Sequence, residues 1–328
     1  MDINTIAKLR QLIEYCRGKQ TYIQTHNFPD ADAIASAFGL QTLFGYFGVS
    51  AKLCYVGSID RLNTRKMTAL LGIEIHNREK YDGEMQENDP IICVDSQKGS
   101  GNIEDLPGDE IACIDHHPFH EVPGLMFHDV RAVGSCATII TSYFKRLAVP
   151  LDPKTATALL YGLKMDTADF RRGVTPEDLD AFKSLFAAYD ADILDNLVAN
   201  NLELKDLHAY GAAIESVNVH QSFGFVHIPF ACPDALIAMI SDFVLSIEEV
   251  NVSIVYSQRP DGWKFSVRSQ IPHEVNAGIL VRSALEGLGS GGGHPFMAGG
   301  MMPLAAVNKL GDAPHKAIMG RFLTSKRC

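Results

Sequence analysis

Short apolar runs alternate with longer amphipathic runs through the first half of the chain. The runs with strand character are TYIQTH, AKLCYVG, PIICVDS and DEIACIDHH, and apolar residues at helical spacing occupy residues 32–47, 59–71, 135–147 and 153–165. Near-continuous apolar strands must be covered on both faces, and their alternation with helices is typical of a parallel sheet. The pattern predicts an α/β fold, in which ligands bind beyond the C-terminal ends of the strands.

Polar residues follow these predicted strands at their C-terminal ends. His26, Asp30 and Asp32 stand together in THNFPDAD, Asp95 ends ICVDS, and residues 115–117 end IACIDHH. An Asp before a helical run is an ordinary N-cap, which explains Asp30 or Asp32 but not both, and leaves His26 unexplained. Core packing does not require three polar clusters to arrive at one sheet edge. We therefore interpret this edge as the functional site.

Carboxylates gathered at this edge need positive charge. With Asp166 in GLKMDT, several carboxylates would repel one another and resist ionisation unless cations were bound among them. Imidazole and carboxylate ligands without thiolate suit Mn²⁺, with Mg²⁺ or Co²⁺ as alternatives, whereas structural zinc sites tend to use Cys. Two such ions can share a carboxylate and activate water for attack on phosphorus. The sequence predicts a site for two divalent metal ions.

Composition narrows the class of protein. The chain has 328 residues, 46% of them apolar, which is enough for a sizeable core and most plausibly two domains. A net charge of −10 and an isoelectric point near 5.6 argue against a broad basic surface for duplex nucleic acid. Seven scattered cysteines without a C-x-x-C pair fit a reduced, cytoplasmic protein. We expect no signal peptide and no membrane span, since Asp242 interrupts the most apolar long run.

The texture of the sequence changes after residue 175. Residues 176–215 are charged and helical in pattern, and we expect them to form a helical linker. In residues 216–328 the strand-like runs FGFVHIP, NVSIVYSQ and WKFSVRSQ alternate with helical runs near residues 235–246 and 274–285. The predicted organisation is a first domain over residues 1–175, the linker, and a smaller α/β domain over residues 216–328.

A glycine-rich stretch near residue 290 needs a separate explanation. GLGSGG matches G-x-G-x-x-G, but it follows a helical run, whereas the dinucleotide fingerprint follows a strand and opens a helix. No Lys-Ser/Thr follows it, so it is not a Walker loop either. A helix C-cap and a flexible turn would need one or two glycines. Gly291, Gly292 and Gly293 before His294 exceed that need, and such a loop can approach and bind a phosphate.

These motifs resemble those of the DHH phosphoesterases. HNFPDAD, VDS, DHHP and GLKMDT are similar to the four motifs of that family, and GSGGGHPFMAG is similar to the signature of its DHHA1 accessory domain. The resemblance implies a parallel-sheet DHH domain and a smaller α/β DHHA1 domain, with the active site in the cleft between them. Its first domain would bind two metal ions.

The resemblance also implies a role for each motif residue. It assigns one metal ion to His26, Asp30 and Asp95, and the other to Asp32, Asp95, His116 and Asp166, with Asp95 bridging. His117 would face the scissile phosphate as a donor or general acid, and Asp115 would orient the histidines.

The substrate would be held by the second domain in this family. The resemblance implies that Gly291, Gly292, Gly293 and His294, with Arg268 on a neighbouring strand, bind the end of the substrate. Arg171 could add positive potential beside Asp166, the alternative being an ordinary solvated loop. Ser290 and Met297 depart from the family pattern G-G-G-G-H-x-x-A-A-G, which affects the floor of the substrate pocket.

The implied activity is a metal-dependent phosphodiesterase or phosphatase. Its expected substrates are small nucleotides: short oligoribonucleotides, linear or cyclic dinucleotides, or 3′-phosphoadenosine 5′-phosphate. An alternative is a RecJ-type single-strand exonuclease, which would need a longer basic groove with stacking aromatics, whereas this chain has one Trp. Another is a family pyrophosphatase, which would lack the glycine loop, and a third is an inactive nucleotide-binding regulator, which would lack metal ligands. The family also suggests a homodimer.

Overall fold

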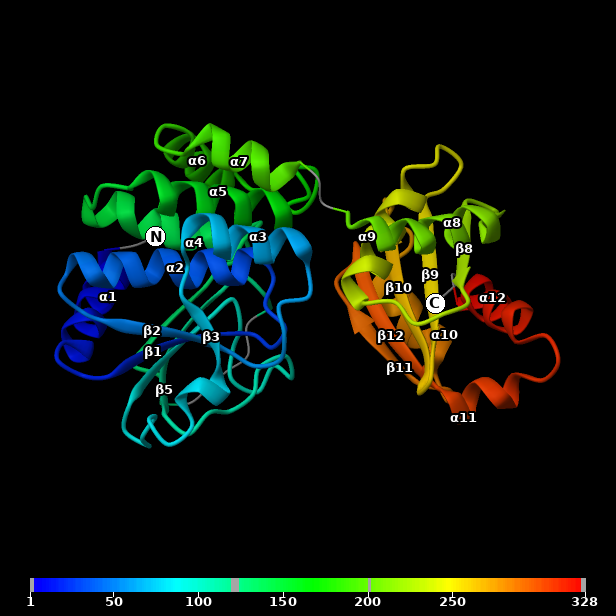
Figure 1. Ribbon diagram of the computed structural model, residues 1–328, viewed down its shortest axis with the longest axis horizontal. Helices are drawn as coiled ribbons and strands as arrows, with labels where there is room; N and C mark the ends of the chain where they lie inside the picture. Colours follow the sequence, from blue (N-terminus) through cyan, green and yellow to red (C-terminus); the bar gives the residue numbers. More distant parts are fainter. Residues whose placement is uncertain (1–2, 119–123, 200–201, 326–328) are drawn as a thin grey trace. The chain divides into compact units, whose positions relative to one another are not determined.

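The computed structural model of the protein describes residues 3–118, 124–199 and 202–325. Two compact units make up the chain, unit 1 from Met1 to Asn201 and unit 2 from Leu202 to Cys328 (Figure 1). Each unit has its own sheet and its own hydrophobic core.

Unit 1 is built on a six-stranded parallel sheet in the order β3-β2-β1-β4-β5-β6. The strands are β1 (Thr21–Thr25), β2 (Ala51–Tyr55), β3 (Ile75–Asn77), β4 (Pro90–Val94), β5 (Asp109–Asp115) and β6 (Phe127–Val130). The chain adds β2 and β3 on one side of β1 and β4 to β6 on the other. The strand order therefore reverses between β1 and β4, and the crevice at such a switch point is where α/β sheets bind ligands.

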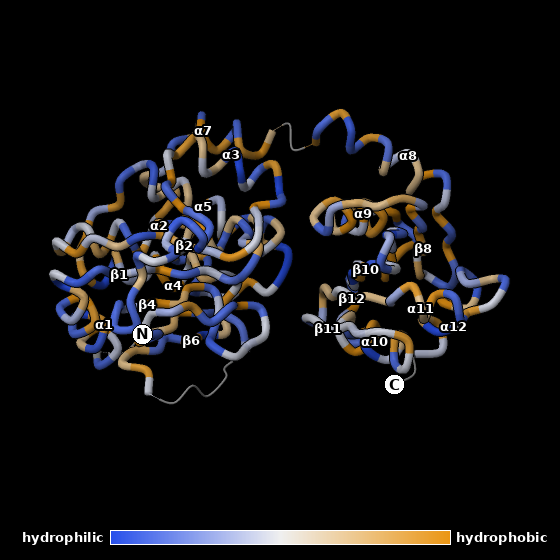
Figure 2. The backbone as a smooth tube through the Cα atoms, turned by 60° about the horizontal axis from the view of Figure 1, so that its bottom comes forward, coloured by the Kyte–Doolittle hydropathy of each residue, from blue (hydrophilic) through white to orange (hydrophobic). Residues whose placement is uncertain are grey.

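Helices cover one face of this sheet. They are α1 (Ile3–Cys16), α2 (Ala31–Tyr46), α3 (Leu62–Leu71), α4 (Cys136–Leu147), α5 (Pro153–Asp166), α6 (Pro176–Phe186) and α7 (Ala191–Val198). Helix α2 lies against α4 and α5, while α6 and α7 form a further layer over them (Figure 1). Apolar and polar residues alternate along several of these helices, as expected when one helix face is buried, whereas α2 is buried on most sides (Figure 2). The opposite face of the sheet is covered by the short 3₁₀ helix η1 (Arg78–Tyr81) and by loops that carry Met85 and Leu106.

Unit 2 contains a mixed sheet in the order β11-β12-β10-β9-β8-β7. Its strands are β7 (Asn218–His220), β8 (Phe223–Ile228), β9 (Val252–Arg259), β10 (Gly262–Ser269), β11 (Ser290–Gly293) and β12 (Met297–Pro303). Only β8 and β9 pair in parallel. The helices are α8 (Leu207–Ser216), α9 (Asp234–Leu245), α10 (Ala277–Leu285), α11 (Leu304–Val307) and α12 (Pro314–Ser325). One core lies beneath α10 and α12 and another beneath α8 and α9.

The structure differs from the sequence analysis in two segments, the expected linker and the glycine-rich stretch. Within the predicted linker of residues 176–215, α6 and α7 pack on the helices of unit 1, and α8 packs on β8 of unit 2. The glycine segment predicted as a loop is the edge strand β11, paired antiparallel with β12. Among the residues described, no helix is both long enough and apolar enough to cross a membrane.

Candidate metal centre

The first motif lies between β1 and α2, at the switch point of the sheet. His26 follows the last residue of β1, and Asp30 is the N-cap of α2. Oδ1 of Asp30 accepts hydrogen bonds from the backbone N–H groups of Asp32 and Ala33, at 3.0 and 3.1 Å. The same atom lies 3.9 Å from Nε2 of His26. The helix cap therefore fixes one carboxylate beside the imidazole that ends the neighbouring strand.

Asp32 lies in the cluster and also stabilises the start of α4. Its Oδ2 accepts a hydrogen bond of 2.7 Å from the N–H of Cys136, and its Oδ1 one of 3.0 Å from the N–H of Ala137. These are the first two residues of α4, so the carboxylate satisfies N–H groups that have no partner inside the helix. Asp32 also offers an oxygen within 4.8 Å of ligand atoms of His116 and Asp166.

Asp95 occupies the centre of the cluster. It directly follows β4 with φ of 59°, a left-handed conformation that Asp adopts more easily than most residues. Its Oδ2 lies 3.6 Å from Nε2 of His26, and its Oδ1 lies 3.3 Å from Nε2 of His116. Oδ1 is buried and accepts no hydrogen bond from any residue in the described part of the chain. A buried carboxylate oxygen without a donor needs a cation.

The DHH motif follows β5, and Asp115 organises it. Oδ1 of Asp115 accepts hydrogen bonds from the backbone N–H groups of His116 and His117, at 2.8 and 3.2 Å, and from Nδ1 of His117, at 2.8 Å. Nδ1 of His116 donates to the carbonyl of Val133 at 3.1 Å, and Nδ1 of His26 donates to the carbonyl of Asn27 at 2.9 Å. With Nδ1 carrying the proton, each of these imidazoles presents Nε2, which is how a metal-binding histidine is oriented.

Asp166 ends α5 and completes the cluster. Its Oδ2 lies 3.2 Å from Nε2 of His116. The guanidinium of Arg172 donates to the backbone carbonyl of Asp166 at 2.7 Å, whereas exposed Arg171 donates to the carbonyl of Ala168. Of the two neighbouring arginines, Arg172 is the one held against Asp166.

The cluster binds protons because it is rich in negative charge. Burial, together with the charges of Asp95 and Asp166, holds the pKa of Asp32 well above its ordinary value. Burial also raises the pKa of Asp166 to about 6. Although burial alone would lower them, the neighbouring carboxylates raise the pKa of His26 to about 9 and the pKa of His116 well above its ordinary value. Divalent cations would supply the same positive charge.

The donor atoms form three overlapping groups, each within a radius that suits a metal ion. The groups are His26, Asp30 and Asp95; Asp32, His116 and Asp166; and Asp95, His116 and His117, with ligand atoms within 4.8 Å of one another in each. Nitrogen and oxygen donors without sulfur suit Mn²⁺ and similar ions. The donor set, the bare Oδ1 of Asp95 and the shared tautomer of the histidines all fit a metal centre. That these residues bind metal remains a prediction.

Two residues near the cluster, Gln97 and Arg61, were not singled out from the sequence. Gln97 donates from Nε2 to Oδ2 of Asp115 at 2.7 Å, and thereby fixes the carboxylate that orients His117. Arg61, directly before α3, lowers the pKa of Asp30 together with His26, against the opposing effect of burial. In the sequence, only their positions could have pointed to these two residues. Gln97 closely follows VDS, and Arg61 lies near the start of the predicted helical run of residues 59–71.

Phe28 stands in the sequence between two candidate ligands, His26 and Asp30, and has an exposed aromatic ring. It has φ of 54°, an uncommon conformation for Phe, and its N–H donates to the carbonyl of Val56 at 2.8 Å. Its side chain is 58% exposed. The ring lies over Gly57, where a Cβ atom would come within 2.6 Å of it. The absence of a side chain at Gly57 therefore leaves room for the Phe28 ring.

The predicted substrate residues of unit 2 lie on β11, directly after β11, and on β10, with β12 between the two strands. Gly291, Gly292 and Gly293 are in β11 and pair with β12, whose Met297 pairs with Arg268 of β10. His294 follows β11, and its carbonyl accepts from the N–H of Gly278. Arg268 is only 7% exposed and donates from Nε to Asp242 at 2.8 Å. That these residues bind substrate remains a prediction.

Two family models match the chain, one in each unit. The model described as DHH family, N-terminal domain, matches residues 20–163. The model described as DHHA1 domain matches residues 223–319.

Three curated relatives show what the chain is similar to. An uncharacterized protein of Methanocaldococcus jannaschii is 29% identical over 88% of this chain and 59% of its own length. A cyclic-di-AMP phosphodiesterase of Geobacillus thermodenitrificans is 28% identical over 96% of this chain and 49% of its own. A probable manganese-dependent inorganic pyrophosphatase of Shouchella clausii is 26% identical over 51% of this chain and 54% of its own. The chain thus spans about half to three fifths of the length of these relatives.

One solved structure resembles the fold over nearly its whole length. It is an exopolyphosphatase-related protein from Bacteroides fragilis, with a TM-score of 0.79, 18% identity, and coverage of 99% of this chain and 98% of that one. At this identity the likeness establishes the fold alone.

Proposed function

Since the chain belongs to the DHH family of phosphoesterases and carries a DHHA1 domain, we propose that it hydrolyses phosphoester bonds of small nucleotides. The proposed substrates are short oligoribonucleotides, linear or cyclic dinucleotides, and 3′-phosphoadenosine 5′-phosphate. The relative named as a cyclic-di-AMP phosphodiesterase aligns with 96% of the chain, whereas the relative named as a pyrophosphatase aligns with 51%. Similarity that extends over both units supports a nucleotide substrate over pyrophosphate.

The observation that carries the proposal is the geometry of Asp95, whose two oxygens face two different histidines while Oδ1 has no donor within the described residues. We assign one divalent ion to His26, Asp30 and Asp95, and a second to Asp32, Asp95, His116 and Asp166. Mn²⁺ fits this donor set best, with Mg²⁺ and Co²⁺ as alternatives. Such ions, when bound, supply an activated water and neutralise charge on the phosphate.

His117 is the proposed proton donor. Asp115 accepts the proton of its Nδ1, so the ring is fixed and Nε2 is directed away from that carboxylate. The hydrogen bond of Asp115 raises the pKa of His117 although burial opposes the effect. A histidine that is held in this way, with a raised pKa, can donate a proton to a phosphate oxygen or to the leaving group. Asp115 is the residue that positions it, and Gln97 in turn holds Asp115.

For unit 2, we propose that the glycine strand and its neighbours bind the part of the nucleotide remote from the scissile bond. Gly291, Gly292 and Gly293 have no side chains of their own to hold a phosphate away from the backbone of β11, and His294 follows directly. Nε and Nη1 of Arg268 are used by Asp242, Ser266 and the carbonyl of Val267. Since no partner of Nη2 is present among the described residues, we propose that this nitrogen binds an anion. Arg171 is exposed and donates to the carbonyl of Ala168, and we propose that it adds positive potential for an anionic substrate.

Mn²⁺ binding and hydrolysis should both depend on Asp95. We expect Asp95→Asn to weaken Mn²⁺ binding at least tenfold and to lower kcat about a thousandfold, because Asn keeps the left-handed backbone but removes the charge. Isothermal titration with Mn²⁺, and assays on dinucleotides, cyclic dinucleotides, 3′-phosphoadenosine 5′-phosphate and pyrophosphate, measure the two effects. Asp312→Asn, which removes an exposed carboxylate of unit 2, is the matched control and should behave as wild type.

The same assays separate the alternatives. Equal activity of wild type and Asp95→Asn on every substrate would reject the metal centre. Faster turnover of long single strands would favour an exonuclease, and faster turnover of pyrophosphate a pyrophosphatase. Nucleotide binding without turnover, with Mn²⁺ bound, would favour a regulator.

A further inference from the structure

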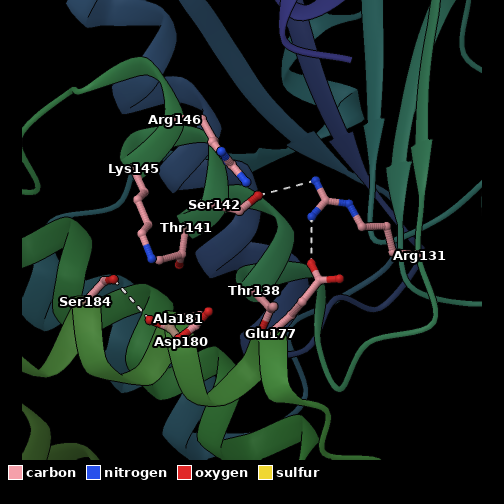
Figure 3. Close-up of a pocket in the computed structure, with 10 residues that line it drawn as sticks. All are labelled: Arg131, Thr138, Thr141, Ser142, Lys145, Arg146, Glu177, Asp180, Ala181 and Ser184. Atoms are coloured by element: carbon pink, nitrogen blue, oxygen red, sulfur yellow. Dashed lines mark hydrogen bonds and ion pairs between the residues drawn. The ribbon is translucent and has the colours of Figure 1, made fainter. Parts of the chain in front are cut away.

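A cavity of about 580 Å³ lies between α4 and α6 of unit 1 (Figure 3). Its walls come from one face of α4, one face of α6 and Arg131, which follows β6. None of the candidate metal ligands lines it. The volume lies within the range of sites that bind small molecules.

Two positively charged side chains at this cavity, Lys145 and Arg146, are not paired with an acidic side chain of the described residues. Arg131 is paired with Asp129 at 2.6 Å and with Glu177 at 3.0 Å. The side chains of Lys145 and Arg146 have no ion-pair or hydrogen-bond partner within residues 3–118, 124–199 and 202–325. A favourable interaction with the helix dipole explains basic residues in the last turn of α4, but it does not require them to line a cavity.

The direction of the two side chains places their charges along the cavity wall. Side chains on a helix lean toward its N-terminus, so Lys145 extends over Thr141 and Arg146 over Ser142 (Figure 3). The two cations are thereby brought next to hydroxyl groups. An anion is the ligand that they would bind most strongly.

The hydroxyl groups of the cavity can act only as acceptors. Thr141 Oγ1 donates its proton to the carbonyl of Ala137 at 2.7 Å, and Ser142 Oγ donates to the carbonyl of Ile139 at 2.6 Å. On α6, Ser184 Oγ donates to the carbonyl of Asp180 at 3.0 Å. The hydroxyl oxygens keep lone pairs as acceptors, although Ser142 Oγ already accepts one hydrogen bond from Nη2 of Arg131 at 3.3 Å, and the carboxylates of α6 are further acceptors. A ligand must therefore bring hydrogen-bond donors as well as an anion.

We propose that this cavity binds a phosphate monoester with free hydroxyl groups, the chemistry of a sugar phosphate or a nucleoside monophosphate. Lys145 and Arg146 bind the phosphate. The sugar hydroxyls donate to Thr141, Ser142 and the Asp180 carboxylate on the opposite wall.

The cavity is joined to the candidate metal centre by one short segment. The N–H of Arg131 donates to the carbonyl of Asp115 at 3.0 Å, and the carbonyl of Val133 accepts from His116. Two residues of α4, Cys136 and Ala137, bind Asp32. A ligand that moves Arg131 or α4 thus acts on three residues of the centre. This coupling rests on the proposed function, whereas the binding itself does not.

Binding is tested on the full chain carrying Asp95→Asn, with EDTA present, so that neither turnover nor metal contributes. Isothermal titration with adenosine 5′-monophosphate, ribose 5-phosphate, inorganic phosphate and adenosine compares the parts of the ligand. We expect both sugar phosphates to bind, and Lys145→Ala with Arg146→Ala to weaken that binding at least tenfold. Lys154→Ala with Lys183→Ala is the matched control, since it removes two exposed lysines of unit 1 that do not line the cavity.

Two results would overturn the binding site. One is equal affinity of the cavity variant and the control variant for the sugar phosphates. The other is binding of inorganic phosphate or adenosine as tight as that of adenosine 5′-monophosphate, which would show that only one half of the ligand is recognised. Thermal unfolding confirms that the cavity variant is folded, as expected for two exposed side chains.

Coupling is tested separately with the otherwise wild-type chain. Saturating adenosine 5′-monophosphate should change the Kd for Mn²⁺ at least fivefold, and this change should disappear in the cavity variant. An identical change in both proteins would overturn the coupling, because it would come from nucleotide bound elsewhere.

Discussion

The candidate metal centre depends on which side-chain atoms of its residues remain available as ligands once the local hydrogen bonds are made. His26 and His116 use Nδ1 to donate to carbonyl oxygens and leave Nε2 for a ligand, while Oδ1 of Asp95 accepts no hydrogen bond in the described part of the chain. The motif residues could be predicted from the sequence because they end strands or open helices. The bonds that orient them could not, since Asp32 reaches a helix 104 residues away and Val133 belongs to no motif.

Phe28 allows a test of substrate recognition at the level of one side chain. We expect Phe28→Gly to raise KM for dinucleotides about tenfold, since stacking of a base on an aromatic ring contributes about 1–3 kcal/mol. The free energy of unfolding should change by less than about 1 kcal/mol, because glycine relieves the left-handed strain of φ 54° but adds chain entropy. Steady-state kinetics and urea unfolding measure the two quantities.

A substrate without a base is the internal control for this variant. KM for pyrophosphate, or for another phosphoester that lacks an aromatic group, should stay within twofold of wild type. Tyr46→Ala removes an aromatic ring of similar exposure at the end of α2 and should leave both substrates unaffected. An equal rise of KM for substrates with and without a base would refute stacking.

At the level of helices and strands, segments with a regular apolar pattern could be predicted from the sequence. The long helices of unit 1 and strands β1, β2, β4, β5, β8, β9 and β10 follow the sequence prediction. The short strands β3, β6 and β7 carry too few residues for a period to be visible. Strand β11 is mostly glycine, so its strand character comes from pairing with β12 and not from its own side chains. Tertiary pairing overrode the turn propensity of Gly291–Gly293.

Asp178 joins α6 to the start of α4, and its loss should be costly. It is fully buried, and its oxygens accept from the N–H of Gly134, the hydroxyl of Thr138 and the N–H of Thr175. We expect Asp178→Ala to reduce the free energy of unfolding by about 3–5 kcal/mol, because it leaves several buried donors without acceptors. Urea unfolding followed by circular dichroism measures the change.

The neighbouring Asp180→Ala provides the comparison for this prediction. Asp180 lies on the same helix with an exposed side chain, so its removal should change stability by less than about 0.5 kcal/mol. Similar stabilities of the two variants would show that the bonds of Asp178 are replaced by water.

At the level of the whole molecule, the unfolding of unit 2 can be followed by a fluorescence signal of its own. Trp263, the single tryptophan of the chain, lies in the core of unit 2 and stacks on His315, with ring centroids 4.8 Å apart. His227 lies 4.2 Å from His315 by the same measure. Burial, and then the charge of His315, lower the pKa of His227 to about 4, and burial lowers that of His315. Both rings are therefore neutral in the folded unit near pH 7.

Unit 2 should lose stability in mild acid for this reason. An unfolded histidine binds a proton below about pH 6.5, whereas folded His227 does so only near pH 4, so the unfolded state binds more protons between these values. Stability is thus full above pH 6.5 and falls as the pH drops toward 4. Allowing for partial solvent access, we expect His227 to account for about 2 kcal/mol of this loss. Urea unfolding followed by Trp263 fluorescence at several pH values measures it.

Replacing His227 by Phe should flatten this pH dependence while keeping the aromatic packing. His220→Gln, at an exposed position of β7, should leave the dependence as in wild type. The same slope in His227→Phe as in wild type would show that other groups cause the acid sensitivity.

The two uses of Asp32 have a consequence for comparing this chain with its homologues. Because Asp32 holds the start of α4, selection for folding alone would retain it in a homologue that had lost all activity. Oδ1 of Asp95, by contrast, accepts no hydrogen bond in the described part of the chain. The presence of Asp at position 32 is therefore weak evidence of catalysis in a related sequence, and under the proposed function the residue at position 95 is the more informative of the two.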